Sequence, residues 1–348
     1  MTRSRQISYG VLPIGTDGQT LVANSANASG LGWNQNFAAG KNKIINGDFG
    51  IWQRGTSFTP AANAYTYLAD RFRHYRDGSG STVTVSQQTF ISGTAPVSGY
   101  EGTYYLRYAQ SVAGTGSTYS EVAQAIEDVR VYAGQTVTFS FWAKADTTRV
   151  VTPSLIQVFG SGGSSAVTTN GAAQTLTTSW ARYTASISVP SVSGKTIGSG
   201  SFLSLSIVLP LNTTQTIDIW GVQLEAGSVA TAFQTATGTL QGELAACQRY
   251  GYTPTGGIGI IGSYYSTTSC YTYINLPVSM RTTPTLTVVS QTGATVFSAG
   301  TSRAATAIAS DTPTVSGVGL AITTSAATAG NVASVVINNG ALFWSAEL

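Results

Sequence analysis

The side chains that could take part in catalysis are few in this 348-residue chain, and none follows a catalytic spacing. Glycoside hydrolysis needs two carboxylates about 5–9.5 Å apart, and no motif selects a pair from the candidate acidic residues. These candidates are Glu101, Glu121, Glu127, Asp128, Asp146, Asp218 and Glu225. His74 is the one histidine and no serine stands in a nucleophile motif, so a catalytic triad is unsupported. We therefore expect no enzymatic activity.

Aromatic side chains are the second group with a chemical use, because a ring with a polar tip can contact a sugar. Most single rings should nevertheless be core or sheet-face residues. The first two thirds of the chain offer Trp52, Tyr65, Tyr67, Tyr100, Tyr104, Tyr105, Trp142 and Trp180. Further along, Tyr264 and Tyr265 stand in a Gly- and Ser-rich stretch, with Tyr271 and Tyr273 close behind. We predict that Tyr264, Tyr265 and Tyr271 contact a ligand.

Two other motifs predict no site. Gly257, Gly259 and Gly262 have the spacing of a dinucleotide fingerprint, but strand-like residues follow where that motif needs a helix. Cys247 and Cys270 lack metal-ligand spacing and cannot form a zinc site with a single histidine. We expect free thiols in a protein made in a reducing cytoplasm.

The composition predicts an all-β protein. Charged residues make up 9% of the chain, against about 25% in typical globular proteins. Thr, Val, Tyr, Ile and Trp favour strands, while Gly and Asn serve turns. So few charges protect a free monomer poorly against association. We favour a chain that buries surface in an oligomer or larger assembly over a neutral monomeric β-sandwich.

The charge balance argues against a nucleic-acid partner. With 17 basic and 14 acidic residues, the chain lacks the concentrated basic face that phosphate binding needs. The densest charged stretch, residues 70–77, predicts a solvated strand with local ion pairs. Alternation should place Arg71, Arg73 and Tyr75 on one face of that strand. No apolar run is long enough to cross a membrane, so we also expect no membrane insertion.

The pattern of elements divides the chain into four parts. They are an extended N-terminal segment (1–40), a β-sandwich jelly roll (41–236), a short helical linker (237–252) and a distal β-sandwich domain (253–348). Asp17-Gly18 predicts a turn between two short apolar strands in the first part. Asn46-Gly47 predicts the first strand of the jelly roll. In the second part, alternating runs such as Thr136–Lys144 and Phe202–Val208 suit two packed sheets.

Residues 238–250 form the one convincing helix. Thr239 can cap it, and Leu240, Leu244 and Cys247 share one face at i, i+4 and i+7. A helix of about three turns is not stable alone. Its apolar stripe must therefore pack on a domain or on copies of itself about a symmetry axis.

Three sets of residues resemble tail-fibre and related appendage proteins of bacteriophages. The N-terminal set is Leu12-Pro-Ile-Gly-Thr-Asp-Gly-Gln-Thr-Leu21 with Gly30-Leu-Gly-Trp33. The middle set, which looks like a jelly roll similar to carbohydrate-binding modules, includes Ile45-Asn-Gly-Asp-Phe49, Trp52-Gln-Arg-Gly55, Ala69-Asp-Arg-Phe72, Gln124-Ala-Ile-Glu-Asp128, Gly134–Lys144 and Trp220-Gly-Val-Gln-Leu-Glu225. The third set is Glu243–Tyr250 with Leu276–Pro284.

The resemblance implies a virion protein, assembled in the bacterial cytoplasm, that forms a homotrimer. Residues 1–40 would attach to other virion proteins, through the apolar side chains Leu12, Ile14, Leu21 and Trp33. Leu240, Leu244 and Cys247 would take part in trimerisation, and the distal end would face the host, whose surface glycans are the expected ligand. Fold likeness alone does not establish sugar binding.

The same resemblance implies one ion and leaves two other functions open. Carbohydrate-binding jelly rolls often carry a structural calcium ion, for which Asp48 and Glu225 occupy comparable places; calcium needs six to eight oxygen ligands. We expect no other cofactor. The alternatives are a capsid-decorating or tail-collar protein without receptor binding and, less in keeping with the sequence, a polysaccharide depolymerase.

Overall fold

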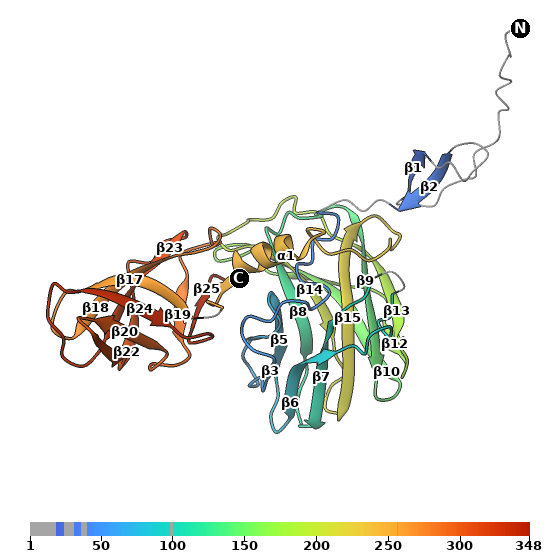
Figure 1. The fold of residues 1–348 in the computed structure, drawn as a ribbon. Coiled ribbons are helices and arrows are strands. Elements are labelled where there is room, and N and C mark those ends of the chain that lie inside the picture. Colours follow the sequence, from blue (N-terminus) through green and yellow to red (C-terminus); the bar gives the residue numbers. More distant parts are fainter. Residues whose placement is uncertain (1–18, 24–30, 36–39, 98–99, 256) are drawn as a thin grey trace, which may run out of the picture.

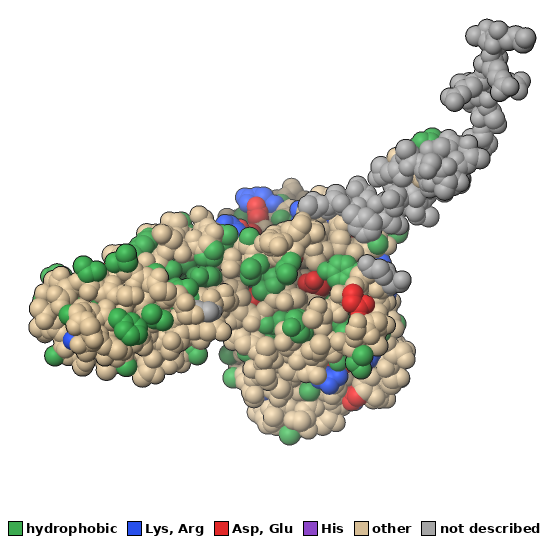
Figure 2. Space-filling model, in the orientation of Figure 1, with side chains coloured by type: hydrophobic (Ala, Val, Ile, Leu, Met, Phe, Trp, Pro, Cys, Tyr) green, Lys and Arg blue, Asp and Glu red, His purple; other side chains and the backbone are tan. Residues whose placement is uncertain are grey.

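The computed structural model describes residues 19–23, 31–35, 40–97, 100–255 and 257–348. Within these ranges the protein is nearly all β, which confirms the predicted fold class (Figure 1). The nine-residue helix α1 (Leu240–Gln248) is too short to cross a membrane, and the described ranges contain no other helix that could do so. Few charged side chains show on the face seen in Figure 2.

Two packed sheets form the jelly roll. Sheet A runs in the order β11-β10-β14-β8-β5-β4, with β12 also paired to β10. Its strands are β4 (Thr66–Tyr67), β5 (Phe72–Arg76), β8 (Ser120–Glu127), β10 (Arg149–Val158), β11 (Val167–Asn170), β12 (Gln174–Leu176) and β14 (Phe202–Val208). Sheet B, in the order β13-β9-β15-β7-β6-β3, contains β3 (Ser57–Phe58), β6 (Thr82–Thr89), β7 (Tyr104–Val112), β9 (Thr136–Ala145), β13 (Ala181–Ser188) and β15 (Gln215–Ala226).

Alternating apolar residues of the two sheets build one core. On β9, Val137, Phe139 and Phe141 are fully buried in it, as the sequence pattern predicts. Trp220 on β15 is fully buried and packs against Trp142 and Phe233. The outer face of sheet B is thus covered at β9 and β15, which explains why these two strands are buried on both sides.

The entry to the jelly roll is not the strand that Asn46-Gly47 predicted. Residues 45–48 form turns, with Asn46 at φ 60°, and the first jelly-roll strand is β3. A β-bulge interrupts β15 between Trp220 and Gln223, and Asn42 satisfies the groups left there by donating to Val222 O and accepting from Leu224 N. Side-chain hydrogen bonds therefore replace strand pairing at this point.

Gly47 brings residues 45–49 into contact with residues 220–225, the first and last stretches of the middle set. Its carbonyl accepts from Val222 N at 2.8 Å, and a Cβ added at Gly47 would lie 2.2 Å from the Val222 oxygen. Only glycine can approach the β15 backbone this closely.

The charged stretch 70–77 is buried rather than solvated, so that prediction was wrong. It contains β5, which lies inside sheet A between β4 and β8. His74 is fully buried beside Tyr108, and burial lowers its pKa to about 4. The predicted separation of faces is confirmed: Phe72 enters the core, whereas Arg73 lies over the ring of Tyr65 outside it.

Helix α1 begins where the sequence predicted, because Thr239 caps it by accepting from Gly242 N at 3.1 Å. Its buried residues are Glu243 and Cys247. Glu243 accepts from Asn46 N at 2.7 Å and so joins the helix to the entry loop of the jelly roll. Cys247 is 1% exposed, whereas Leu240 is 68% and Leu244 36% exposed. The stripe predicted at these three positions is divided between the interior and the surface.

The C-terminal domain is a second, smaller β-sandwich. Sheet C has the order β16-β25-β19, with β16 (Gly251–Tyr252), β19 (Thr285–Val288) and β25 (Leu342–Ser345). Sheet D runs β21-β20-β24-β17-β18-β23-β22, with β17 (Ile258–Tyr264), β18 (Ser269–Asn275), β20 (Ala294–Ser298), β21 (Thr301–Ala304), β22 (Ala307–Asp311), β23 (Gly317–Thr323) and β24 (Val332–Ile337). The two sheets share one core that includes Trp344 and Ile274. Gly259 and Gly262 of the glycine motif lie in β17 and Gly257 directly precedes it, as the strand-like surroundings indicated.

The N-terminal segment contains one described hairpin, which projects away from the jelly roll (Figure 1). It pairs β1 (Gln19–Ala23) with β2 (Leu31–Gln35) in antiparallel register. The predicted turn at Asp17-Gly18, and the strand before it, lie outside the described residues. The second strand of that prediction is present at Gln19–Ala23, where its partner is β2.

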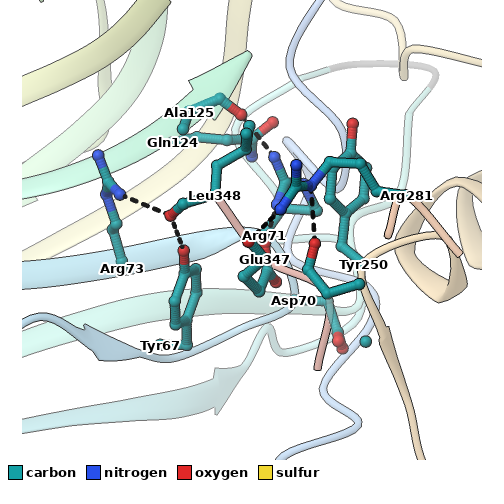
Figure 3. A network of polar contacts seen from close by, with 12 residues as sticks. Tyr67, Asp70, Arg71, Arg73, Gln124, Ala125, Tyr250, Arg281, Glu347 and Leu348 are labelled. Atoms are coloured by element: carbon teal, nitrogen blue, oxygen red, sulfur yellow. Dashed lines mark hydrogen bonds and ion pairs between the residues drawn. The ribbon is translucent and has the colours of Figure 1, made fainter. Parts of the chain in front are cut away.

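A buried ionic contact joins the two sandwiches (Figure 3). Arg71, 1% exposed, forms an ion pair with Glu347 and donates to the Ala125 carbonyl. The centroid of the Tyr250 ring lies 3.4 Å from the Arg71 guanidinium carbon. Arg54 reaches the same Glu347 at 2.9 Å. We call Arg54, Arg71, Tyr250 and Glu347 the interdomain lock.

Asp70 lies beside the interdomain lock and is 1% exposed. It accepts from Gln53 N at 2.7 Å and forms a longer ion pair with Arg54 at 3.7 Å. Burial raises the pKa of the Asp70 carboxyl to about 6, although Arg54 acts in the opposite direction. Burial therefore favours the neutral acid more in the folded than in the unfolded state, and the carboxylate predominates above about pH 6.

Glu347→Gln should lower the free energy of unfolding by about 3 kcal/mol, because it leaves the buried Arg71 guanidinium without a counter-charge. Asp128→Asn is the matched control: it removes the charge from an ion pair with Arg130 whose side chains are 47% and 60% exposed. That change should cost less than about 1 kcal/mol. Urea unfolding of the full chain measures both, and equal losses would contradict a dominant role for the lock.

Asp70→Asn should change how stability depends on pH. Because the folded pKa of about 6 exceeds the ordinary 3.8, Asp70 adds stability below about pH 4 that is lost as the pH rises through 6, a change of about 3 kcal/mol. His74, with its lowered pKa, acts in the opposite direction over the same range. The difference between wild type and Asp70→Asn in urea unfolding therefore isolates Asp70. A difference that stays constant with pH would contradict the raised pKa.

Candidate functional site

The outer face of sheet A, turned away from the jelly-roll core, gathers polar and aromatic side chains. One row crosses six strands through successive cross-strand partners, which share a face of a sheet. The row is Tyr67, Arg73, Ala123, Ser206, Ser154 and Asn170. Neighbouring residues on these strands, such as Phe72, Val122 and Leu155, point into the core, so the row points outward.

Glu121 is the polar centre of this face. It is 1% exposed, and its Oε2 accepts from the Tyr119 hydroxyl at 2.7 Å and from the Ser206 hydroxyl. Its Oε1 accepts from the Tyr65 hydroxyl at 3.4 Å. Burial and the nearby Glu121 charge raise the pKa of both Tyr65 and Tyr119, so both phenols remain hydrogen-bond donors.

Three tyrosine rings lie side by side above this carboxylate. The ring centroids are 5.0 Å apart between Tyr65 and Tyr75 and 6.4 Å apart between Tyr75 and Tyr119. Tyr65 is 51% exposed, and the Arg73 guanidinium lies 4.2 Å from its ring centroid on the side toward Phe202. We call Tyr65, Tyr75 and Tyr119 the tyrosine ladder. Among the described residues, the Tyr75 hydroxyl has no hydrogen-bond partner.

Small side chains occupy the middle of the face beside the tyrosine ladder. The hydroxyls of Ser154 and Ser204 are buried there and have no hydrogen-bond partner within the described part of the chain. Because Ser154 and Ser204 are buried, a ligand cannot reach their hydroxyls, and the accessible contacts of this face are those of the tyrosine ladder.

Residues 346–348 cover one end of the face (Figure 3). The Leu348 carbonyl oxygen accepts from Tyr67 at 2.7 Å and from Arg73 at 3.2 Å. The interdomain lock holds this segment in place through Glu347. The tyrosine ladder lies beyond the covered end, so a ligand on this face would contact the ladder rather than Tyr67.

Residues 74–201 match the model of a carbohydrate-binding domain family. This range is less than half of the chain, and it contains Tyr75, Tyr119 and Glu121 but not Tyr65, Arg73 or Ser206. The jelly roll is therefore similar to a carbohydrate-binding module, which points to a binding rather than a catalytic domain. No curated protein matches the sequence.

Solved structures with a similar jelly roll include carbohydrate-binding modules. One, titled "CBM4 structure and function", is 25% identical, with a TM-score of 0.32, over 53% of this chain and 99% of its own. The xylan-binding CBM22-2 domain of Paenibacillus barcinonensis Xyn10C is 18% identical, with a TM-score of 0.32, over 53% and 97%. The enzymatically active domain of tailspike protein 4 of bacteriophage CBA120 is 14% identical, with a TM-score of 0.31, over 54% and 22%.

The residues do not fit the calcium site that the resemblance implied. Glu225 is fully buried, and its carboxylate accepts from Thr231 N at 2.8 Å and the Thr231 hydroxyl at 2.7 Å, with Lys41 at 3.5 Å. Asp48 shares none of these partners and accepts from the Tyr100 hydroxyl at 2.8 Å beside a cavity of about 570 Å³. The described residues contain no cluster of three His, Cys, Asp or Glu side chains able to hold a metal.

The three tyrosines predicted to contact a ligand differ in their exposure. Tyr264 is 1% exposed and its hydroxyl bonds Thr324 at 2.8 Å, so this ring belongs to the core and is not available to a ligand. The prediction missed this because an inward position on β17 cannot be read from the Gly-rich sequence around it. Tyr265 and Tyr271 are exposed and pack edge to face, 5.9 Å apart.

The structure describes only some of the residues predicted for virion attachment and trimerisation. Leu12 and Ile14 lie outside the described residues, while Leu21 is exposed and stands opposite Trp33 in the β1–β2 hairpin. Cys247 is packed inside the protomer, where burial raises its thiol pKa well above the ordinary value, so it cannot contribute to an intersubunit surface. Leu240 and Leu244 are exposed and remain available for a contact between subunits.

Sequence reasoning missed the polar centre of the candidate site. It named Glu121 only as one of many carboxylates, named Tyr65 as one of many rings, and did not select Tyr119. Alternation within 119–127 places Tyr119 and Glu121 on one face, which could have identified the pair. Their meeting with Tyr65 depends on the order of strands in sheet A, which no local pattern gives.

Proposed function

We propose that this chain is a bacteriophage fibre-like appendage protein that binds a glycan on the outer face of sheet A. The tyrosine ladder above Glu121 carries the proposal. It combines accessible rings with hydroxyls held in fixed positions, and residues 74–201 match a carbohydrate-binding domain. The protein would act by binding, without catalysis.

The geometry suits a sugar because the two kinds of contact lie side by side. A sugar ring has an apolar C–H face that can lie on a tyrosine ring, and hydroxyls at its rim. The free Tyr75 hydroxyl and the exposed Asn170 amide lie on the same face of sheet A and can meet those hydroxyls. Because Glu121 already holds Tyr65 and Tyr119 in place, little side-chain conformational freedom would be lost on binding.

The virion role is supported by the low charge of the chain and by the resemblance of four short stretches to phage fibre sequences. These are residues 12–21, 30–33, 243–250 and 276–284. Residues 1–40 would attach to other virion proteins, and the two β-sandwiches would face the host cell surface. Three copies would combine weak glycan contacts into a firm attachment. The exposed Leu240 and Leu244 at the start of α1 are the side chains we assign to the trimer contact.

Tyr75→Ala should weaken glycan binding by about tenfold, which corresponds to about 1.4 kcal/mol, because it removes the central ring of the ladder. Tyr75→Phe keeps the ring and should lose less. A glycan array identifies a ligand of the full chain, and calorimetric titration then compares the variants. Equal affinity of wild type and Tyr75→Ala for that glycan would place its site elsewhere.

Light scattering at micromolar concentration should give the mass of three copies of the 36.0-kDa chain. Leu240→Asp combined with Leu244→Asp should reduce that mass, because two charges cannot be buried in an apolar contact. Val150→Asp is the control, since Val150 is 52% exposed on β10 and does not line the cavity that Leu240 borders. A wild-type monomer would contradict the trimer, and a trimer in the double variant would remove α1 from its interface.

A further inference from the structure

The C-terminal domain has a cavity of its own, of about 450 Å³, on the outer face of sheet D. This volume lies within the range of small-ligand sites, roughly 300–1,000 Å³. Strands β17 and β18 supply Ile261, Tyr271 and Tyr273, and the end of β22 supplies Asp311 with Thr312 beside it. The jelly-roll site described above shares none of these residues.

Apolar side chains form one wall of this cavity. Ile261 is 81%, Tyr273 48% and Tyr271 39% exposed, so all three offer surface to a ligand. Tyr271 and Tyr273 alternate with buried residues along β18 and therefore point to the same side. Tyr265 supports the Tyr271 ring edge to face.

The Tyr273 ring is held in place by the strand beneath it. A Cβ added at Gly317 would lie 2.3 Å from the Tyr273 hydroxyl, so glycine at this position lets the ring lie across the β23 backbone. The hydroxyl also lies 3.5 Å from the Thr314 hydroxyl. The ring is thus positioned before any ligand arrives.

Asp311 provides a carboxylate at the opposite wall with no cation to balance it. It forms no ion pair with any described residue, and its one side-chain hydrogen bond comes from the neighbouring Thr312 at 3.4 Å. Thr312 has φ 40°, a left-handed conformation that costs energy in a β-branched residue. The turn packs closely on Gly319, where a Cβ would lie 2.5 Å from the Asp311 carbonyl oxygen.

We infer that this cavity is a second saccharide-binding site, for an uncharged sugar unit that lies on Tyr271 and Tyr273 and donates hydroxyls to Asp311. An uncompensated carboxylate favours hydroxyl donors and repels acidic sugars such as uronates. It also argues against a second copy of the chain as the occupant, because the centre of a protein interface is depleted of charge. Hydrophobic side chains with few charges between them mark the visible surface of this domain (Figure 2).

The test uses the full chain carrying Tyr75→Ala, so that binding at the jelly roll is weakened. Cellohexaose, chitohexaose and maltohexaose serve as neutral probes and hexagalacturonate as the acidic one, each followed by saturation-transfer NMR. We expect at least one neutral hexasaccharide to bind and the uronate not to bind. Adding Tyr271→Ala or Asp311→Asn should weaken binding of the neutral probe about tenfold, and Asp311→Asn should also reduce the discrimination against the uronate.

Phe297→Ala is the matched control, because Phe297 is 45% exposed on β20 but does not line the cavity. It should change affinity less than about twofold. Equal weakening by Phe297→Ala and Tyr271→Ala would overturn the site, as would self-association that Tyr271→Ala abolishes. If no neutral probe binds in the Tyr75→Ala chain while the wild type binds one, the second site is wrong and the jelly-roll proposal stands.

Discussion

The arrangement of the whole molecule depends on one guanidinium kept away from water. Arg71 directly precedes β5, pairs with Glu347 and stacks on Tyr250, so it ties the jelly roll to both the helical linker and the end of the second sandwich. A buried charge is costly unless it is paired and hydrogen-bonded. Once Arg71 is buried in sheet A, residues 346–348 must remain against the jelly roll to satisfy it.

The interdomain lock also defines the candidate glycan site. By fixing Leu348 over Tyr67 and Arg73, it covers one end of the outer face of sheet A and leaves the tyrosine ladder accessible. Glu121, buried beneath the ladder, keeps the Tyr65 and Tyr119 phenols in place through hydrogen bonds. Arg73, which helps to hold Leu348, and Tyr75 of the ladder thus lie on the same strand, β5.

Polar side chains also join separate elements at the entry to the jelly roll. Asn42 fills the gap left by the bulge in β15, and Gln124 bonds the Ile45 backbone in both directions at 2.9 and 2.8 Å. Glu243 bonds the next residue from the helix. Residues 42–46 are therefore held by side-chain hydrogen bonds to the sheets and to α1. These bonds take the place of strand pairing, so the segment forms no strand.

The sequence alone determined the fold class, the alternating strands such as β9 and β14, and the helix with its Thr239 cap, because these depend on local spacing and residue type. It also supplied the likeness of the middle segment to carbohydrate-binding modules. Only the tertiary structure decided that residues 70–77 are buried, that Tyr264 and Cys247 face the interior, and that Tyr65 meets Glu121. Each of these depends on which distant strand lies alongside, and side-chain periodicity carries no information about that choice.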